Sequence, residues 1–268
     1  MVQVDKTANL QATGDSANDI LSNDNFDKLL IEIDYVKGLK PTDEAMNNFV
    51  DFFLKVYTFK EDIQFVYDET PSPNEDELTL NEIVELESKN RTFYNTGSTL
   101  AICIYFADAP SDDDDEDQGL VTLGSVYRNT SMIIHEFTVR KLASKSPFID
   151  NADVETATIN HEFAHLFGLV NLGTAMVNPH EDNTTANHCD QDGCLMQAKL
   201  QFGVPINKNP LPGNKKSGEN DIKADCSLSG QSVLQMLEKQ SAKGSAASIN
   251  LGIECIRDIK ANGGKFLN

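Results

Sequence analysis

Positive charge is scarce in this chain. Its 268 residues hold 22 Lys and Arg against 42 Asp and Glu, which gives a formal net charge of −20. Nucleic acids and anionic membrane surfaces would repel a chain of this charge, so we expect neither as a partner. The excess of carboxylates instead favours solubility, and it favours cationic substrates or divalent ions.

Long hydrophobic runs are also missing. No stretch of about 18 consecutive apolar residues occurs, so the sequence predicts no transmembrane helix. No secretory signal peptide is visible after Met1. Residues 1–25 are polar and rich in Asn, Asp, Ser and Thr. We expect them to form a flexible leader on a processed chain.

The five cysteines include no C-x-x-C pair, which disfavours a structural zinc site built on them. Cys103 lies in an apolar run and is expected to be a buried free thiol. The other four could form two disulfides, for instance Cys189 with Cys194 and Cys226 with Cys255, although four cysteines allow three pairings. Two disulfides would suit an extracytoplasmic compartment.

What the chain does contain is a pair of histidines at helical spacing. His161 and His165 are four residues apart, so in an α-helix both side chains lie on one face and can reach the same metal ion. Glu162 lies about 100° round the helix from His161, beside the place that a water would take. This H-E-x-x-H pattern is typical of zinc hydrolases. Two solvated surface histidines are the plain alternative.

The third metal ligand has more than one candidate. His188 opens the segment HC-x4-CLM, which ends at Met196. His180 is a rival, and a carboxylate such as Asp182 is a further alternative. Asn171 is a poor zinc ligand, because zinc sites favour Cys, His, Asp and Glu.

The segment HEFAHLFG, residues 161–168, resembles the start of the metzincin signature H-E-x-x-H-x-x-G-x-x-H. Asn171 stands where that signature has its third histidine. The segment HC-x4-CLM resembles the one that archaemetzincins place at the third-ligand position, so residues 169–187 read as an insertion. The longer pattern is similar to that of zinc metalloproteases of Bacteroidetes that are described as surface or membrane proteins.

The resemblance implies a metzincin-like zincin with Zn²⁺ bound by His161, His165 and His188. Glu162 would be the general base, and Met196 would lie in the methionine turn beneath the metal. The C-x-x-C pair that archaemetzincins carry further on is missing here, which puts their second zinc in doubt. The resemblance also implies a location at the cell surface, in the periplasm or outside the cell, as a processed lipoprotein whose precursor carries a lipid anchor.

Hydrophobic periodicity predicts strands that alternate with helices up to Gly168. This order favours an α/β (α+β) fold with a twisted, mostly parallel sheet. We expect an upper subdomain at 26–170 and a smaller, irregular and helical lower subdomain at 171–268. The expected strands are Lys28–Val36, with Glu32 and Asp34 on a wetter face, Asp62–Asp68, Ser98–Ala107, Leu120–Tyr127 and Thr130–Thr138, and the later helices are Asp153–Phe167, Gln231–Ser241 and Leu251–Ala261.

Two further stretches are candidates for binding. In metzincins, the strand before the last one forms the edge of the sheet and pairs with an extended substrate, which implies a substrate-binding edge at Gly124, Ser125, Val126 and Tyr127; an ordinary hairpin strand is the alternative. The acidic run at 111–117 could bind Ca²⁺, although it lacks the alternation of an EF-hand loop.

The sequence therefore predicts a monomeric zinc-dependent endopeptidase that acts on a peptide or protein substrate. The alternative is a surface binding or adhesion module on the same scaffold, with little or no proteolytic activity. An acidic calcium-binding protein, in which the H-E-x-x-H pattern is incidental, is a third interpretation.

Overall fold

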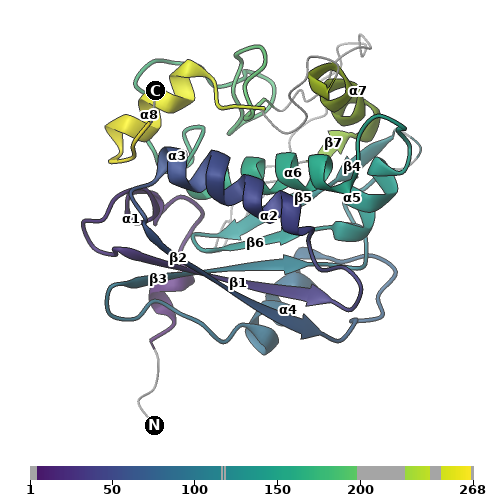
Figure 1. Cartoon of the computed structure of the whole chain (residues 1–268), viewed down its shortest axis with the longest axis horizontal. Coiled ribbons are helices and arrows are strands. Elements are labelled where there is room, and N and C mark those ends of the chain that lie inside the picture. The colour runs from purple at the N-terminus through teal and green to yellow at the C-terminus, as the bar shows by residue number, and fades with distance from the viewer. Residues whose placement is uncertain (1–4, 116, 118, 198–226, 242–248, 267–268) are drawn as a thin grey trace.

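A five-stranded mixed sheet lies at the centre of the computed structural model, which describes residues 5–115, 117, 119–197, 227–241 and 249–266 (Figure 1). The strand order is β2-β1-β3-β6-β5, and all neighbours pair in parallel except β5, which is antiparallel to β6. The mostly parallel α/β fold predicted from the sequence is thereby confirmed. The strands are β1 (Lys28–Val36), β2 (Asp62–Thr70), β3 (Thr99–Phe106), β5 (Gly124–Arg128) and β6 (Ser131–Ile134).

Helices cover both faces of this sheet. One face carries α2 (Asp43–Phe49), α5 (Glu136–Ala143) and α6 (Asn151–Leu166), whereas α4 (Leu80–Asn90) lies on the other (Figure 1). The two faces have separate hydrophobic cores. Burial on both faces explains why β3 reads as a continuous apolar run.

The remaining elements are short or lie near the C-terminus. The chain continues from α2 through a π-helical turn into α3, and β4 pairs with β7 in a small antiparallel sheet. None of the described helices has the length and apolar character needed to cross a membrane. These elements are η1 (Thr7–Asn9), α1 (Ala17–Leu21), the turn Val50–Leu54, α3 (Lys55–Tyr57), β4 (Leu120–Thr122), β7 (Ser227–Ser229), α7 (Gly230–Ser241) and α8 (Ile253–Ala261).

Residues 5–25 differ from the flexible leader that their composition predicted. Ile20 and Leu21 in α1 are fully buried in the main core. Asn9 is also buried, and its side-chain amide donates to the Ala101 carbonyl at 3.0 Å and to Thr130 Oγ1 at 3.1 Å. Two apolar residues and well-paired polar side chains therefore anchor a segment whose average composition is polar.

Two local predictions were wrong for physical reasons. The strand expected at Thr130–Thr138 ends at Ile134, and α5 follows because Val139, Leu142 and Ala143 bury a helical face. The face of β1 that carries Glu32 and Asp34 was expected to be wetter, yet both residues are buried. Three hydrogen bonds compensate Glu32, which accepts from Thr92 N, Thr92 Oγ1 and Phe93 N.

Candidate metal centre

Helix α6 positions the H-E-x-x-H motif. Its N-terminus carries a capping box in which the Asp150 carboxylate accepts from Asp153 N at 3.1 Å, and the Asp153 carboxylate accepts from Asp150 N at 3.0 Å. The helix is buried on every side from Val154 to Leu166. Phe163 packs edge-to-face on Phe49 of α2 with ring centroids 4.9 Å apart. This packing holds the motif in a fixed orientation against the sheet.

Three histidines converge beside this helix. One ligand atom each from His161, His165 and His188 lies within 4.8 Å of the other two, and all three residues are buried. Their ring centroids are 4.9, 5.4 and 5.2 Å apart. The structure thus brings His188 to the helical pair, as the inserted-segment interpretation predicted.

Backbone carbonyls orient each of the three rings. The Nδ1 atoms of His161, His165 and His188 lie 2.8, 2.9 and 2.8 Å from the carbonyl oxygens of Leu195, Leu169 and Ala186, respectively. An Nδ1–H that donates to a carbonyl leaves the lone pair on Nε2, which is the tautomer that binds a metal. All three rings therefore have the tautomer that binds a metal through Nε2.

Burial keeps these rings neutral. It lowers the pKa of His161 to about 4, and the neighbouring His188 adds to that effect. Burial also lowers the pKa of His165 well below its usual range, and it lowers the pKa of His188. Neutral imidazole is the form that coordinates Zn²⁺, so the chemistry of the donor set fits this ion at neutral pH.

Glu162 lies on the side of helix α6 that meets strand β5 at Gly124, and only 1% of it is exposed. A Cβ at Gly124 would come within 2.7 Å of Glu162 Cγ, so only glycine lets the strand approach this side chain so closely. The spacing of the motif does not reveal this contact, because Gly124 is distant in the sequence.

The segment that ends at Met196 closes the other side of the site. Met196 is fully buried, and its carbonyl accepts from Cys189 N at 2.7 Å. The Leu195 carbonyl accepts from His161, as described above, and Leu195 N donates to the Asn250 carbonyl at 3.0 Å. Leu195 and Met196, at the predicted methionine turn, are thus held by backbone hydrogen bonds, and Leu195 contacts His161.

The inserted residues 169–187 place His180 elsewhere. His180 is buried, but its Nε2 lies 2.7 Å from Asp258 Oδ2 in α8 and its Nδ1 lies 3.3 Å from Cys189 Sγ. It is therefore not grouped with His161 and His165. Asn171, at the position of the signature's third histidine, is exposed and donates to Glu181 Oε2 at 3.1 Å.

The predicted disulfides are not formed. Cys103, Cys189, Cys194 and Cys255 are all free thiols, and all are buried. Burial had been expected for Cys103 alone. Cys226 lies outside the described residues. The Cys194 and Cys255 sulfur atoms are 3.6 Å apart, too far for the covalent bond of about 2.0 Å.

The acidic run gives no support for calcium. Among the described residues, no group of three candidate metal ligands includes a member of the run 111–117. The acidic group that the structure does bring together consists of Glu32, Asp34 and Asp68, in β1 and β2. Glu32 already accepts three hydrogen bonds there.

Strand β5 forms one edge of the five-stranded sheet in the part of the chain that is described. Its residues alternate between the two faces: Val126 joins the core on the α6 side, and Tyr127 joins the core on the α4 side. Gly124 lies against Glu162, as described above. The strand predicted as a substrate-binding edge therefore contacts the H-E-x-x-H motif where Gly124 lies against Glu162.

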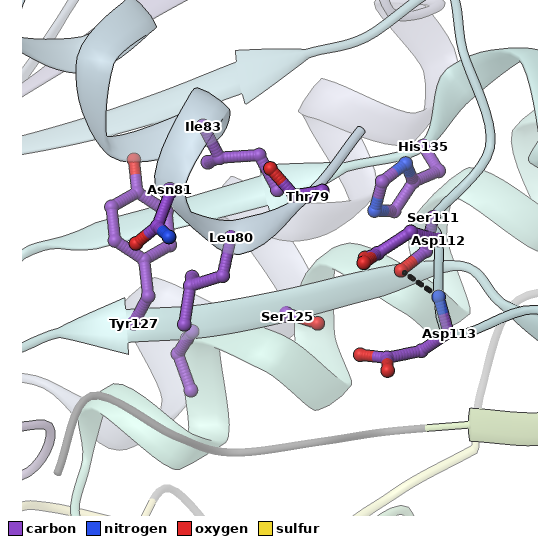
Figure 2. A pocket seen from close by; sticks show the side chains of 11 residues that line it. Thr79, Leu80, Asn81, Ile83, Ser111, Asp112, Asp113, Ser125, Tyr127 and His135 are labelled. Atoms are coloured by element: carbon purple, nitrogen blue, oxygen red, sulfur yellow. Dashed lines mark hydrogen bonds between the residues drawn. The ribbon is translucent and has the colours of Figure 1, made fainter. Parts of the chain in front are cut away.

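A cavity of about 370 Å³ adjoins this strand on the α4 side. Figure 2 shows Ser125 between Tyr127 and the acidic segment that carries Asp112 and Asp113. Asp113 N donates to Ser111 Oγ at 3.2 Å, which orders this segment. His135 also lines the cavity, and burial lowers its pKa to about 4, so it is neutral at pH 7.

No protein-family model and no curated protein matches the chain. Among solved structures, the chain is similar to the crystal structure of archaemetzincin from Methanopyrus kandleri. The identity is 12%, the TM-score is 0.47, and the match covers 88% of this chain and 96% of that chain. A similarity at this level says nothing about the activity or the ligands of this chain.

Proposed function

We propose that this chain is a zinc-dependent endopeptidase. The observation that supports the proposal best is the convergence of three buried, neutral imidazoles from His161, His165 and His188 beside the buried carboxylate of Glu162. Three protein ligands leave a position for water or substrate, which is the donor count of catalytic rather than structural zinc sites.

Zinc in such a site supplies a Lewis acid that polarises a carbonyl and makes water acidic. The protein's own groups do the rest. Glu162, the residue next to His161, would take a proton from the attacking water and later give it to the leaving amine. His161, His165 and His188 are held by their Nδ1 hydrogen bonds and do not need to reorganise during the reaction.

Strand β5 would dock the substrate. An extended peptide that adds to a sheet edge is held by backbone hydrogen bonds, and its side chains point alternately to the two faces. Beside β5, one set would face the histidines and the other set would face the cavity near Asp112 and Asp113. Together with the net charge of −20, this acidic lining favours substrates with Lys or Arg side chains.

The decisive test is Glu162→Gln, which removes the base and keeps the shape of the side chain. We expect kcat/KM on a peptide library to fall by about 10²- to 10⁴-fold while zinc content stays unchanged. Glu85→Gln on the exposed side of α4 is the matched control for the change in charge. Full activity of Glu162→Gln would exclude the assigned role.

The same experiment addresses the alternative function. A wild-type protein that binds zinc and a surface ligand, but cleaves no peptide in the library, would instead be a binding or adhesion module. The extracytoplasmic location that we also propose no longer has the support of disulfides, since the four described cysteines are free.

A further inference from the structure

A second group of metal-binding side chains lies close to the three histidines. One ligand atom each from His180, Cys189 and Cys255 lies within 4.8 Å of the other two, and all three residues are buried. Cys194 joins them, because its sulfur is 3.6 Å from that of Cys255. Three thiols and one imidazole thus lie together. They come from the inserted residues 169–187, the HC-x4-CLM segment and helix α8.

Backbone amides surround the sulfur atoms. Gln191 N donates to Cys189 Sγ at 3.4 Å, and Met196 N and Gly252 N donate to Cys194 Sγ at 3.4 and 3.1 Å. A Cβ at Gly252 would lie 3.1 Å from Cys194 Cβ and 3.2 Å from its Sγ, which is a tight contact, so glycine favours this close approach. N–H donors stabilise sulfur in its thiolate form, which is the form that binds a metal.

His180 is also oriented to bind a metal, through its Nδ1 atom. Asp258 Oδ2 lies 2.7 Å from its Nε2, so Nε2–H donates to the carboxylate and the lone pair belongs to Nδ1. That nitrogen lies 3.3 Å from Cys189 Sγ, on the side of the thiols. Asp258 is itself fixed, because its Oδ1 accepts from Val177 N at 2.7 Å. A carboxylate behind a histidine is a common outer partner in zinc sites.

We propose that Cys189, Cys194, Cys255 and His180 bind a second metal ion, best matched by Zn²⁺, in a closed four-ligand site. A set of three thiolates and one imidazole is a standard composition for structural zinc, and it leaves no position for a substrate. The spacing of the cysteines did not predict it, because the site uses a histidine from residues 169–187 and a cysteine from α8 instead of a C-x-x-C pair.

This second centre would hold the loop that completes the first one. Cys189 directly follows His188, and the Met196 carbonyl accepts from Cys189 N. Fixing the sulfur of Cys189 therefore restrains the neighbouring histidine and the turn at Met196. The proposal does not depend on proteolysis, since a closed structural site would exist even in a chain that hydrolyses nothing.

The test uses the full chain, purified under reducing conditions, with zinc counted and Co²⁺ substituted for spectroscopy. Wild type should hold about two metal ions, with thiolate-to-cobalt charge-transfer bands in the near ultraviolet. Cys255→Ser should lose about one ion and weaken those bands, whereas Cys103→Ser, a buried thiol outside the group, should keep both. His165→Ala should lose the other ion and keep the bands.

If Cys255→Ser does not fold, the metal content and the cobalt spectrum of the wild-type protein test the proposal. A single ion without thiolate bands would overturn the proposal. So would a disulfide between Cys194 and Cys255, detected by peptide mapping of wild-type protein purified without reductant. Both results leave the test of Glu162→Gln untouched, so failure of this proposal is distinguishable from failure of the proposed function.

Discussion

The two groups of candidate metal ligands lie close together but are held by different kinds of structure. The three-histidine group takes two members from α6, a helix buried on every side by hydrophobic packing. The second group takes its members from two irregular segments and one helix, and the two segments are joined by an isolated β-bridge between Glu181 and Cys189. A framework that is already rigid can keep an open metal position for chemistry. A framework made of loops gains its rigidity from a metal with every position filled.

Replacing one ligand in each group should give the largest difference in activity and stability between the two groups. His165→Ala should reduce kcat/KM by roughly 10⁴-fold or more, because the Lewis acid is lost along with the water that Glu162 serves. Its melting temperature should change less than that of Cys255→Ser, since packing and not metal holds α6. Peptidase assays and thermal unfolding of both variants measure the difference. Equal losses of stability would mean that α6 depends on its metal as much as the loops do.

A substitution at Gly124 should affect the three-histidine group and leave the second group unchanged. Gly124→Ala places a methyl group within 2.7 Å of Glu162 Cγ and must displace that side chain or the strand. We expect kcat/KM to fall by about 10²-fold, which is the cost of misplacing a catalytic group by about 1 Å. Metal content should stay at the wild-type level. Ser88→Ala, at an exposed position of α4 away from β5, serves as the control, and an equal loss in both variants would argue against the contact with Glu162.

The smallest effect on catalysis should come from substitutions in the cavity beside β5, which lies outside both groups. The double change Asp112→Asn and Asp113→Asn should raise KM about two- to five-fold for peptides with Lys or Arg, as expected for partly exposed ion pairs. Peptides without a cationic side chain should be unaffected, and added salt should reduce the difference. Asp76→Asn, at an exposed position, is the control. An effect that is the same for neutral peptides would point to a disturbed strand instead of a charge.

Local periodicity predicted the alternating framework and the helix of His161 and His165, because both depend on neighbours a few residues apart. The choice between His188 and His180 stayed open, because it depends on how residues 169–187 fold back. The grouping of Cys194 with Cys255 was beyond reach for the same reason, since these residues are 61 positions apart. Burial of Glu32 and of Asn9 was missed because hydrogen-bond partners from distant segments compensate their polarity.

The 61 positions between Cys194 and Cys255 affect how well the chain tolerates insertions and deletions. A metal that joins Cys194 to Cys255 would close a loop of 61 residues as the chain folds, because the metal site does not exist in the unfolded chain. The closure entropy grows only with the logarithm of loop length, so doubling the loop changes it by about 0.6 kcal/mol. Insertions and deletions between the two anchoring cysteines should therefore cost little closure entropy, whereas losing either anchor removes the cross-link entirely.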